Sequence, residues 1–115
     1  MRWFHSEEEN ELGALMAYKE AHYGARYLVE FLDGESYICT YATAYESENG
    51  GELDIEEDHP LYDEFWEIAM DIEQTVKNGL RRYGDSLALT YRDFPALIKD
   101  WDTGAVVFSA DAPPA

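Results

Sequence analysis

The chain has 115 residues, a length that favours one domain with a single hydrophobic core, and 46% of them are hydrophobic. Its formal net charge is −17 at pH 7, from 25 acids and 8 bases, so nucleic acids and anionic lipids would repel it. We therefore exclude direct nucleic-acid binding and membrane association, and expect cationic or neutral partners. The lone cysteine, Cys39, and an acidic start without a signal-peptide core favour a cytoplasmic protein.

The acids are concentrated in one part of the chain. Between Arg26 and Lys77, fifty residues carry fifteen acids and no base, so −15 of the net charge lies there. The densest stretch is ESENGGELDIEEDHPLYDE, residues 46–64, with nine carboxylates. From Lys77 to Lys99 the balance reverses, with five bases against two acids. The chain is therefore polarised as well as acidic.

The first predicted element is a helix over residues 7–20. Ser6 and Glu9 have the spacing of a capping box, and apolar residues follow at helical intervals from Leu12 onward. Gly24 is suited to a left-handed C-terminal cap. We therefore expect this helix to end near Gly24.

A β-hairpin is predicted within ARYLVEFLDGESYICTYATAYES, residues 25–47. Asp33 and Gly34 suit a two-residue turn, and a loop of that length pairs Phe31 with Ser36, Val29 with Ile38 and Tyr27 with Thr40. In this register Tyr27, Val29 and Phe31 face the core, and Tyr37, Tyr41 and Tyr45 line the opposite face. Either that tyrosine face lies under a helix, or it binds a partner.

A second helix is predicted over about residues 60–77, after an acidic loop. Pro60 suits a first helical turn, and Leu61, Phe65, Ile68, Ala69, Ile72 and Val76 fall on one arc at 100° per residue. The acids occupy the other side of the helix, and Trp66 lies at the border of the apolar arc. On this reading Asp63, Glu67 and Asp71 are one turn apart, which gives a row of carboxylates.

Two further strands are predicted in DSLALTY, residues 85–91, and GAVVFS, residues 104–109, and a frayed tail in residues 110–115. The order α-ββ-α-ββ indicates a single α+β domain over residues 1–109, with an antiparallel sheet of about four strands and two helices. A small barrel with helical insertions is the alternative fold.

The chain shows no motif for catalysis or for a cofactor. It has no nucleophile elbow, glycine-rich phosphate loop or dinucleotide fingerprint, and His5, His22 and His59 have no partner at zinc-ligand spacing. The acids of residues 54–58 do not follow the order of a calcium loop. Cys39 is interpreted as a small buried hydrophobic residue. We expect a protein that is not an enzyme and has neither cofactor nor metal site.

The acidic segment predicts a negative surface that binds a basic patch on another protein, such as a nucleic-acid-binding enzyme. In composition the chain resembles the acidic nucleic-acid mimics that phages and plasmids use against restriction or CRISPR enzymes. The alternatives are an immunity-type protein that neutralises a basic toxin, a self-associating structural protein that forms a homodimer, and a surface that is only solubilising. The predicted partner-binding residues are Glu46, Glu48, Glu52, Asp54, Glu56, Glu57, Asp58, Asp63, Glu64, Glu67, Asp71, Tyr37, Tyr41 and Trp66.

Overall fold

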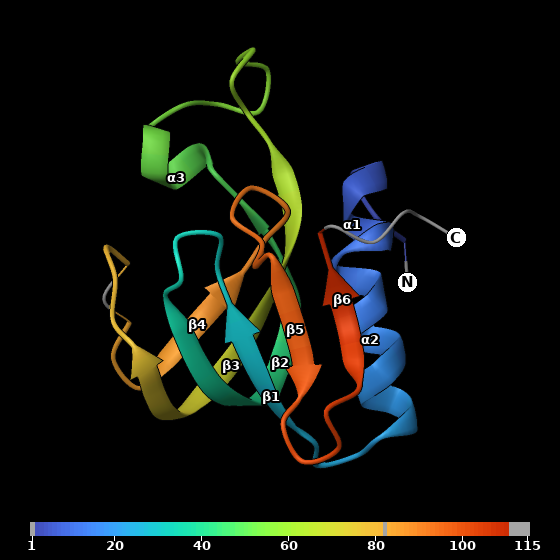
Figure 1. Ribbon diagram of the computed structural model, residues 1–115. Coiled ribbons are helices and arrows are strands. Elements are labelled where there is room, and N and C mark those ends of the chain that lie inside the picture. Colours follow the sequence, from blue (N-terminus) through green and yellow to red (C-terminus); the bar gives the residue numbers. More distant parts are fainter. Residues whose placement is uncertain (1, 82, 111–115) are drawn as a thin grey trace.

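The structure is a computed structural model that describes residues 2–81 and 83–110. Six antiparallel strands form one open sheet in the order β4-β3-β2-β1-β5-β6 (Figure 1). The α+β class is confirmed, but the sheet has six strands rather than about four, and β4 and β6 leave it open rather than closed as a barrel. The elements are α1 (Ser6–Asn10), α2 (Leu12–Ala21), β1 (Arg26–Glu30), β2 (Ser36–Glu48), α3 (Gly50–Leu53), β3 (Glu64–Lys77), β4 (Ser86–Leu89), β5 (Leu97–Asp100) and β6 (Val106–Ser109).

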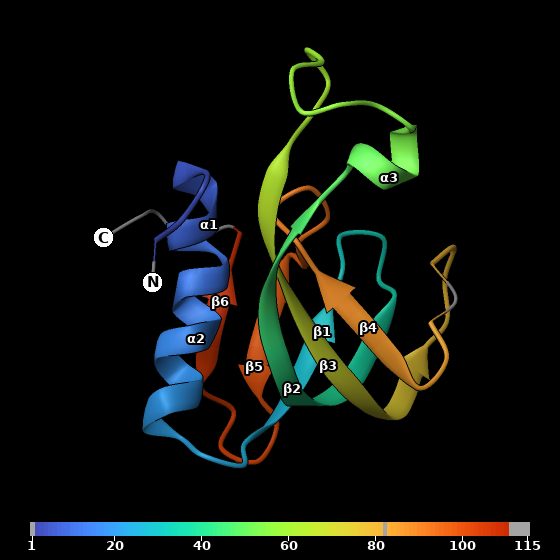
Figure 2. The same cartoon turned by 180° about the vertical axis from the view of Figure 1, so that it is seen from behind.

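The N-terminal helical prediction is confirmed, although the segment consists of two helices, α1 and α2, joined at Glu11. The cap lies one residue earlier than expected, because the carboxylate of Glu8 accepts the backbone N–H of His5 at 2.9 Å. Leu12 and Leu15 of α2 are fully buried in the core with residues of the sheet. Figure 2 shows α2 running alongside β6.

The β1–β2 hairpin is present, but its predicted register is wrong by one residue. The N–H of Phe31 donates to the carbonyl of Glu35 at 2.8 Å, so the loop has three residues and Gly34 takes a φ of +92°. Tyr27 therefore lies opposite Cys39, and Val29 opposite Tyr37. Because a one-residue slip exchanges the two faces of a strand, Tyr37 and Cys39 are in the core instead of on the opposite face.

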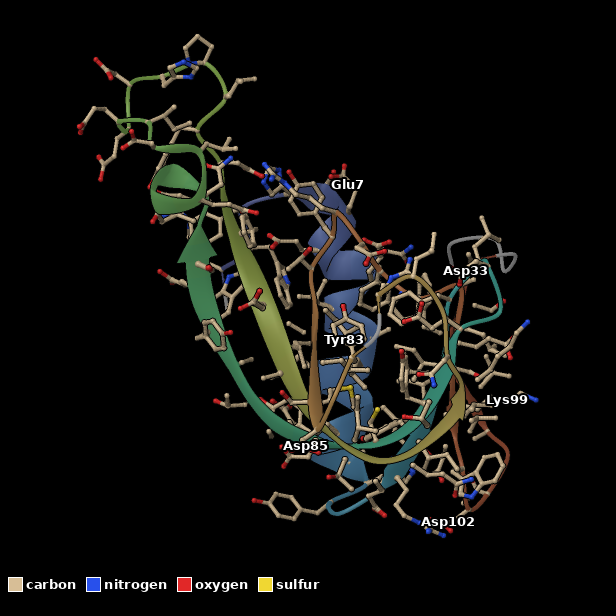
Figure 3. All side chains as sticks on the ribbon, turned by 90° about the vertical axis from the view of Figure 1, so that its left-hand side faces the viewer. Glu7, Asp33, Tyr83, Asp85, Lys99 and Asp102 are labelled. Carbon is tan, nitrogen blue, oxygen red and sulfur yellow. The ribbon has the colours of Figure 1, made fainter. Side chains whose placement is uncertain are left out.

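The helix predicted over residues 60–77 is wrong, because most of this segment is β3, a 14-residue strand paired with the 13 residues of β2. Figure 3 shows both as long curved ribbons. Ile68 and Met70 are fully buried, while Asp71 and Glu73 are exposed, which is the alternation of a strand. The sequence of this segment permits both the period of a helix and that of a strand, and pairing with β2 selects the strand. The only helix between β2 and β3 is the four-residue α3, in the segment predicted as a loop.

At the C-terminus, the N–H of Ala110, the first residue of the predicted tail, donates to the carbonyl of Ala96 at 2.8 Å. The rest of that tail, residues 111–115, lies outside the described residues. Among the described helices, none has the length and apolar character needed to cross a membrane.

Candidate functional site

The acidic stretch 46–64 forms an arm that projects from one end of the sheet, at the top of Figure 1. We call it the β2–β3 arm. Its base is held by the buried Asn49, whose amide donates to the carbonyl of Leu61 and whose amide oxygen accepts the N–H of Asp63, both at 2.8 Å. Asp54 adopts a left-handed φ of 54° and ends α3. The arm is therefore an ordered extension of the hairpin formed by β2 and β3.

The arm and the N-terminal segment enclose a hollow of about 240 Å³, lined by Phe4, Glu46, Glu48, Tyr62 and Glu64 together with Ser47. We call these five residues the carboxylate groove. A neighbouring hollow adds Arg2 and Trp3, and another adds acids of the arm beyond Glu48. The side chain of Phe4 is 40% exposed, so an apolar ring lies next to three carboxylates.

Most carboxylates of this region form no ion pair among the described residues, and Arg2, which shares a hollow with Glu46 and Glu64, forms none either. The ion pairs among the described residues use five acids, namely Asp33, Glu35, Asp63, Asp93 and Asp102. Of the eleven acids predicted for partner binding, only Asp63 belongs to that set. Arg26, Arg81 and Arg92 are all engaged by these acids. Ten of the predicted carboxylates are thus without an ion pair in the described part of the chain.

Asp63 has a structural role at the base of the arm. Its carboxylate contacts Nε2 of His5 at 2.7 Å, the hydroxyl of Tyr91 at 2.5 Å and a guanidinium nitrogen of Arg92 at 2.9 Å. The same Nε2 lies 3.0 Å from the carbonyl of Glu64, so this nitrogen faces two acceptors and carries a proton. Burial alone would raise the pKa of Asp63, but the hydrogen bonds from Tyr91 and His5 and the charge of Arg92 lower it overall. Asp63 therefore joins the arm to α1 and to the segment after β4.

Two tyrosines, Tyr62 of the groove and Tyr45 of β2, donate to carboxylates that have no ion pair among the described residues. The hydroxyl of Tyr62 donates to Glu64 at 3.1 Å, and that of Tyr45 donates to Glu67. Burial and the hydrogen bond to Glu64 raise the pKa of Tyr62 to about 12. The hydrogen bond to Glu67 and burial raise the pKa of Tyr45 to about 12 as well. Both hydroxyls therefore remain protonated donors at neutral pH, and they leave the negative charge of the surface in place.

Three aromatic residues were predicted to bind a partner, and the structure separates them. Tyr37 is 0% exposed and donates to the buried Glu35 at 2.5 Å, so its assignment to a partner surface is wrong because of the register of the hairpin. Tyr41 is half-buried, with the ammonium of Lys19 4.5 Å from its ring centroid. Trp66 is half-buried against Trp3 and donates its indole N–H to the backbone of residue 2 at 2.8 Å.

The predicted row of Asp63, Glu67 and Asp71 is also corrected. On a strand, residues four apart are separated by about 13 Å, which is more than twice the helical spacing. These acids therefore do not form the close row that a helix would give. The groove also contains Phe4 and Tyr62, which were not predicted. Tyr62 belongs to the arm itself, whereas the approach of Phe4 to Glu46 and Glu48 depends on the packing of the N-terminal segment beside the arm.

A reactive cysteine or a cluster of metal ligands could carry chemistry in the described residues. Burial raises the pKa of the Cys39 thiol to about 12, so the thiolate is not formed at neutral pH. No three His, Cys, Asp or Glu side chains in residues 2–81 and 83–110 are placed to hold a metal ion. Comparison of the chain with protein-family models, curated proteins and solved structures gives no match.

Proposed function

We propose that the protein is a non-enzymatic binding module whose carboxylate groove and β2–β3 arm engage a basic patch on another protein. The observation that supports the proposal is the set of ten predicted carboxylates without an ion pair among the described residues, several of them around a groove with an exposed phenylalanine. A surface that is only solubilising would have no need to concentrate the carboxylates around aromatic rings.

Arginine is the side chain that this groove suits best. A guanidinium can accept a carboxylate on its edge and an aromatic ring on its face, and Glu46, Glu48 and Glu64 lie beside Phe4 and Tyr62. An exposed ion pair contributes only about 0.2–1 kcal/mol, so tight binding needs many such contacts together. The arm supplies further carboxylates at Glu52, Asp54, Glu56, Glu57 and Asp58. Nucleic-acid-binding enzymes hold phosphates with clustered lysines and arginines, and we propose that the protein inhibits such an enzyme as a nucleic-acid mimic.

The proposal is tested with two variants of equal charge. The groove variant carries Glu46→Gln, Glu48→Gln and Glu64→Gln. The amide oxygen at position 48 can still accept the N–H of Gly50, and the one at position 64 can still accept the hydroxyl of Tyr62. The control variant carries Glu20→Gln, Glu73→Gln and Asp85→Asn, three exposed acids outside the groove. Figure 3 shows Asp85 at the opposite end of the molecule from the arm.

The experiment is affinity capture of partners from the native host at 50 and 300 mM salt. We expect the wild-type chain and the control variant to retain a basic protein at the lower salt only, and the groove variant to lose it. Added DNA or RNA should displace the captured protein if it is a nucleic-acid-binding enzyme. Capture of a toxin that nucleic acid does not displace would instead assign the immunity-type function, and capture by the groove variant equal to wild type would contradict the proposal.

A further inference from the structure

A second pocket lies at the other end of the sheet from the arm, where the C-terminal end of α2 leads into β1 (Figure 2). Its volume is about 220 Å³. The residues that line it come from α2, the turn after it, β1 and β2, and none is an acid. They are Lys19, Tyr23, Gly24, Ala25, Tyr27, Thr40, Tyr41 and Ala42. This pocket is lined by three tyrosines, one lysine and no carboxylate, whereas each of the hollows at the arm is lined by acids.

Local backbone features shape this pocket. Gly24 has a φ of +78° and reverses the chain after α2, where a residue with a Cβ would be strained. In β2, Tyr41 pairs with Met70 and Thr43 pairs with Ala69, which leaves Ala42 as the extra residue of a bulge. The bulge and the turn therefore leave a space between the end of the helix and the sheet.

Lys19 supplies a positive charge at the pocket. Its ammonium lies over the Tyr41 ring, 4.5 Å from the centroid, and has no ion pair among the described residues. A lysine held by an aromatic face keeps its charge available to an anion.

Tyr27 lines the pocket and carries a buried hydroxyl. Its side chain is 1% exposed, and the hydroxyl has no hydrogen-bond partner within the described residues. Buried hydroxyls are normally hydrogen-bonded, so this group is an unused donor. Burial raises the pKa of Tyr27 to about 12, and the hydroxyl therefore carries its proton at neutral pH.

We propose that this pocket binds a small aromatic carboxylate. A cavity of about 150 Å³ is enough for benzene, and drug-sized ligands need about 300–1,000 Å³, so this pocket suits one ring with a short substituent. The tyrosine rings would contact the ring of the ligand, and Lys19 would pair with its carboxylate. A ligand oxygen that reaches the Tyr27 hydroxyl would supply the missing acceptor. This inference is independent of the proposed function, because the pocket shares no residue with the carboxylate groove.

The test is a titration of the whole chain with benzoate, followed by amide NMR at 150 mM salt, where the screening length is about 8 Å and distant acids are largely screened. We expect saturable shifts at Ala25, Thr40 and Ala42, with a dissociation constant of about 1–10 mM, as is usual for so small a ligand. Benzylamine and benzyl alcohol, which carry the same ring without the negative charge, should give no saturable shift at these amides.

The matched variants are Lys19→Met and Lys99→Met, which remove one positive charge inside and outside the pocket. We expect Lys19→Met to weaken benzoate binding at least fivefold and Lys99→Met to leave it within twofold of wild type. Equal shifts with benzylamine would overturn the proposal even if the Lys19 variant failed to fold. Absence of saturable shifts with benzoate, or unchanged affinity in a folded Lys19→Met variant, would overturn it as well.

Discussion

Two acidic regions of this molecule use their carboxylates in opposite ways. Around Arg81, three acids from two loops converge on one guanidinium: Asp93 at 2.7 and 2.8 Å, Asp33 at 3.2 Å and Glu35 at 3.5 Å. Figure 3 labels Asp33 at this corner of the sheet. In the β2–β3 arm, by contrast, the described acids other than Asp63 have no ion pair.

The contrast does not follow from exposure alone, because the side chains of Asp33 and Asp93 beside Arg81 are 44% and 48% exposed and only that of Glu35 is fully buried. The Glu35 side chain is fully buried, so its charge must be compensated by Arg81 and by the hydroxyl of Tyr37. Glu46, Glu48 and Glu64 of the groove are exposed, so water solvates them and only mutual repulsion opposes their clustering. The first group stabilises the fold, and the second remains available to a partner.

The largest effect is expected from Arg81→Met. Methionine retains an apolar side chain over Phe31, whose ring centroid lies 3.9 Å from the guanidinium carbon, but it leaves Glu35 buried without its cation. Removing one partner of a buried ion pair is strongly destabilising, and we expect a loss of about 3 kcal/mol in the free energy of unfolding. Urea unfolding at pH 7 measures it. Glu52→Gln in the arm is the control and should change stability by less than about 0.5 kcal/mol. Equal effects of the two changes would remove the distinction between the regions.

A smaller loss is expected from Glu8→Gln. Both carboxylate oxygens of this fully buried residue accept hydrogen bonds, from the N–H groups of Phe4 and His5 at 2.8 and 2.9 Å and from that of Trp66 at 2.6 Å. An amide would place N–H₂ against one of these donors, which costs about 2 kcal/mol. Urea unfolding tests this, and the amide NMR signal of Trp66 should shift strongly. A variant as stable as wild type would show that Glu8 does not hold α1 to β3.

The smallest effect is expected from Asp93→Asn, and it should depend on pH. Hydrogen bonds and charge from Arg81 lower the pKa of Asp93 below its ordinary value of 3.8, although burial opposes this. A lowered folded-state pKa stabilises the protein above pH 3.8, and the stabilisation is lost as the pH falls through the folded-state value. At pH 7 the variant should be about 1 kcal/mol less stable than wild type, and the difference should shrink below pH 3.8. A difference that stays constant from pH 7 to pH 2 would contradict this origin.

The sequence predicts the elements whose signals are local. The helical periodicity from Leu12 and the turn residues Asp33 and Gly34 lead correctly to α2 and to the β1–β2 hairpin. The register fails because the side chain of Asp33 accepts the N–H of Glu35 at 3.0 Å and closes a three-residue loop. Asp33 and Gly34 are compatible with a loop of two or of three residues, and each loop length gives a different register. The sequence therefore did not decide between the two registers.

For β3, two periodicities coexist in the same residues. Phe65, Ile68 and Ile72 fit a helical arc, while Ile68, Met70 and Ile72 fit a strand. Pairing with β2 decides that this segment is a strand, and the residues of β2 are distant from it in the sequence. The site divides in the same way: the charge count locates the acidic arm, but the contribution of Phe4 to the groove depends on tertiary packing that no local pattern reports.

The central claim is that the carboxylate groove, and not the net charge, recognises a basic partner. The most direct measurement is the affinity of a nine-arginine peptide for the wild-type chain, the groove variant and the control variant at 50 mM salt. Both variants lose three charges, so their net charge is −14 instead of −17. We expect the groove variant to bind the peptide about tenfold more weakly, because it loses three carboxylate–arginine pairs at about 0.5 kcal/mol each. The control variant should stay within about twofold of wild type. Equal losses in the two variants would show that net charge alone governs binding and would contradict the account.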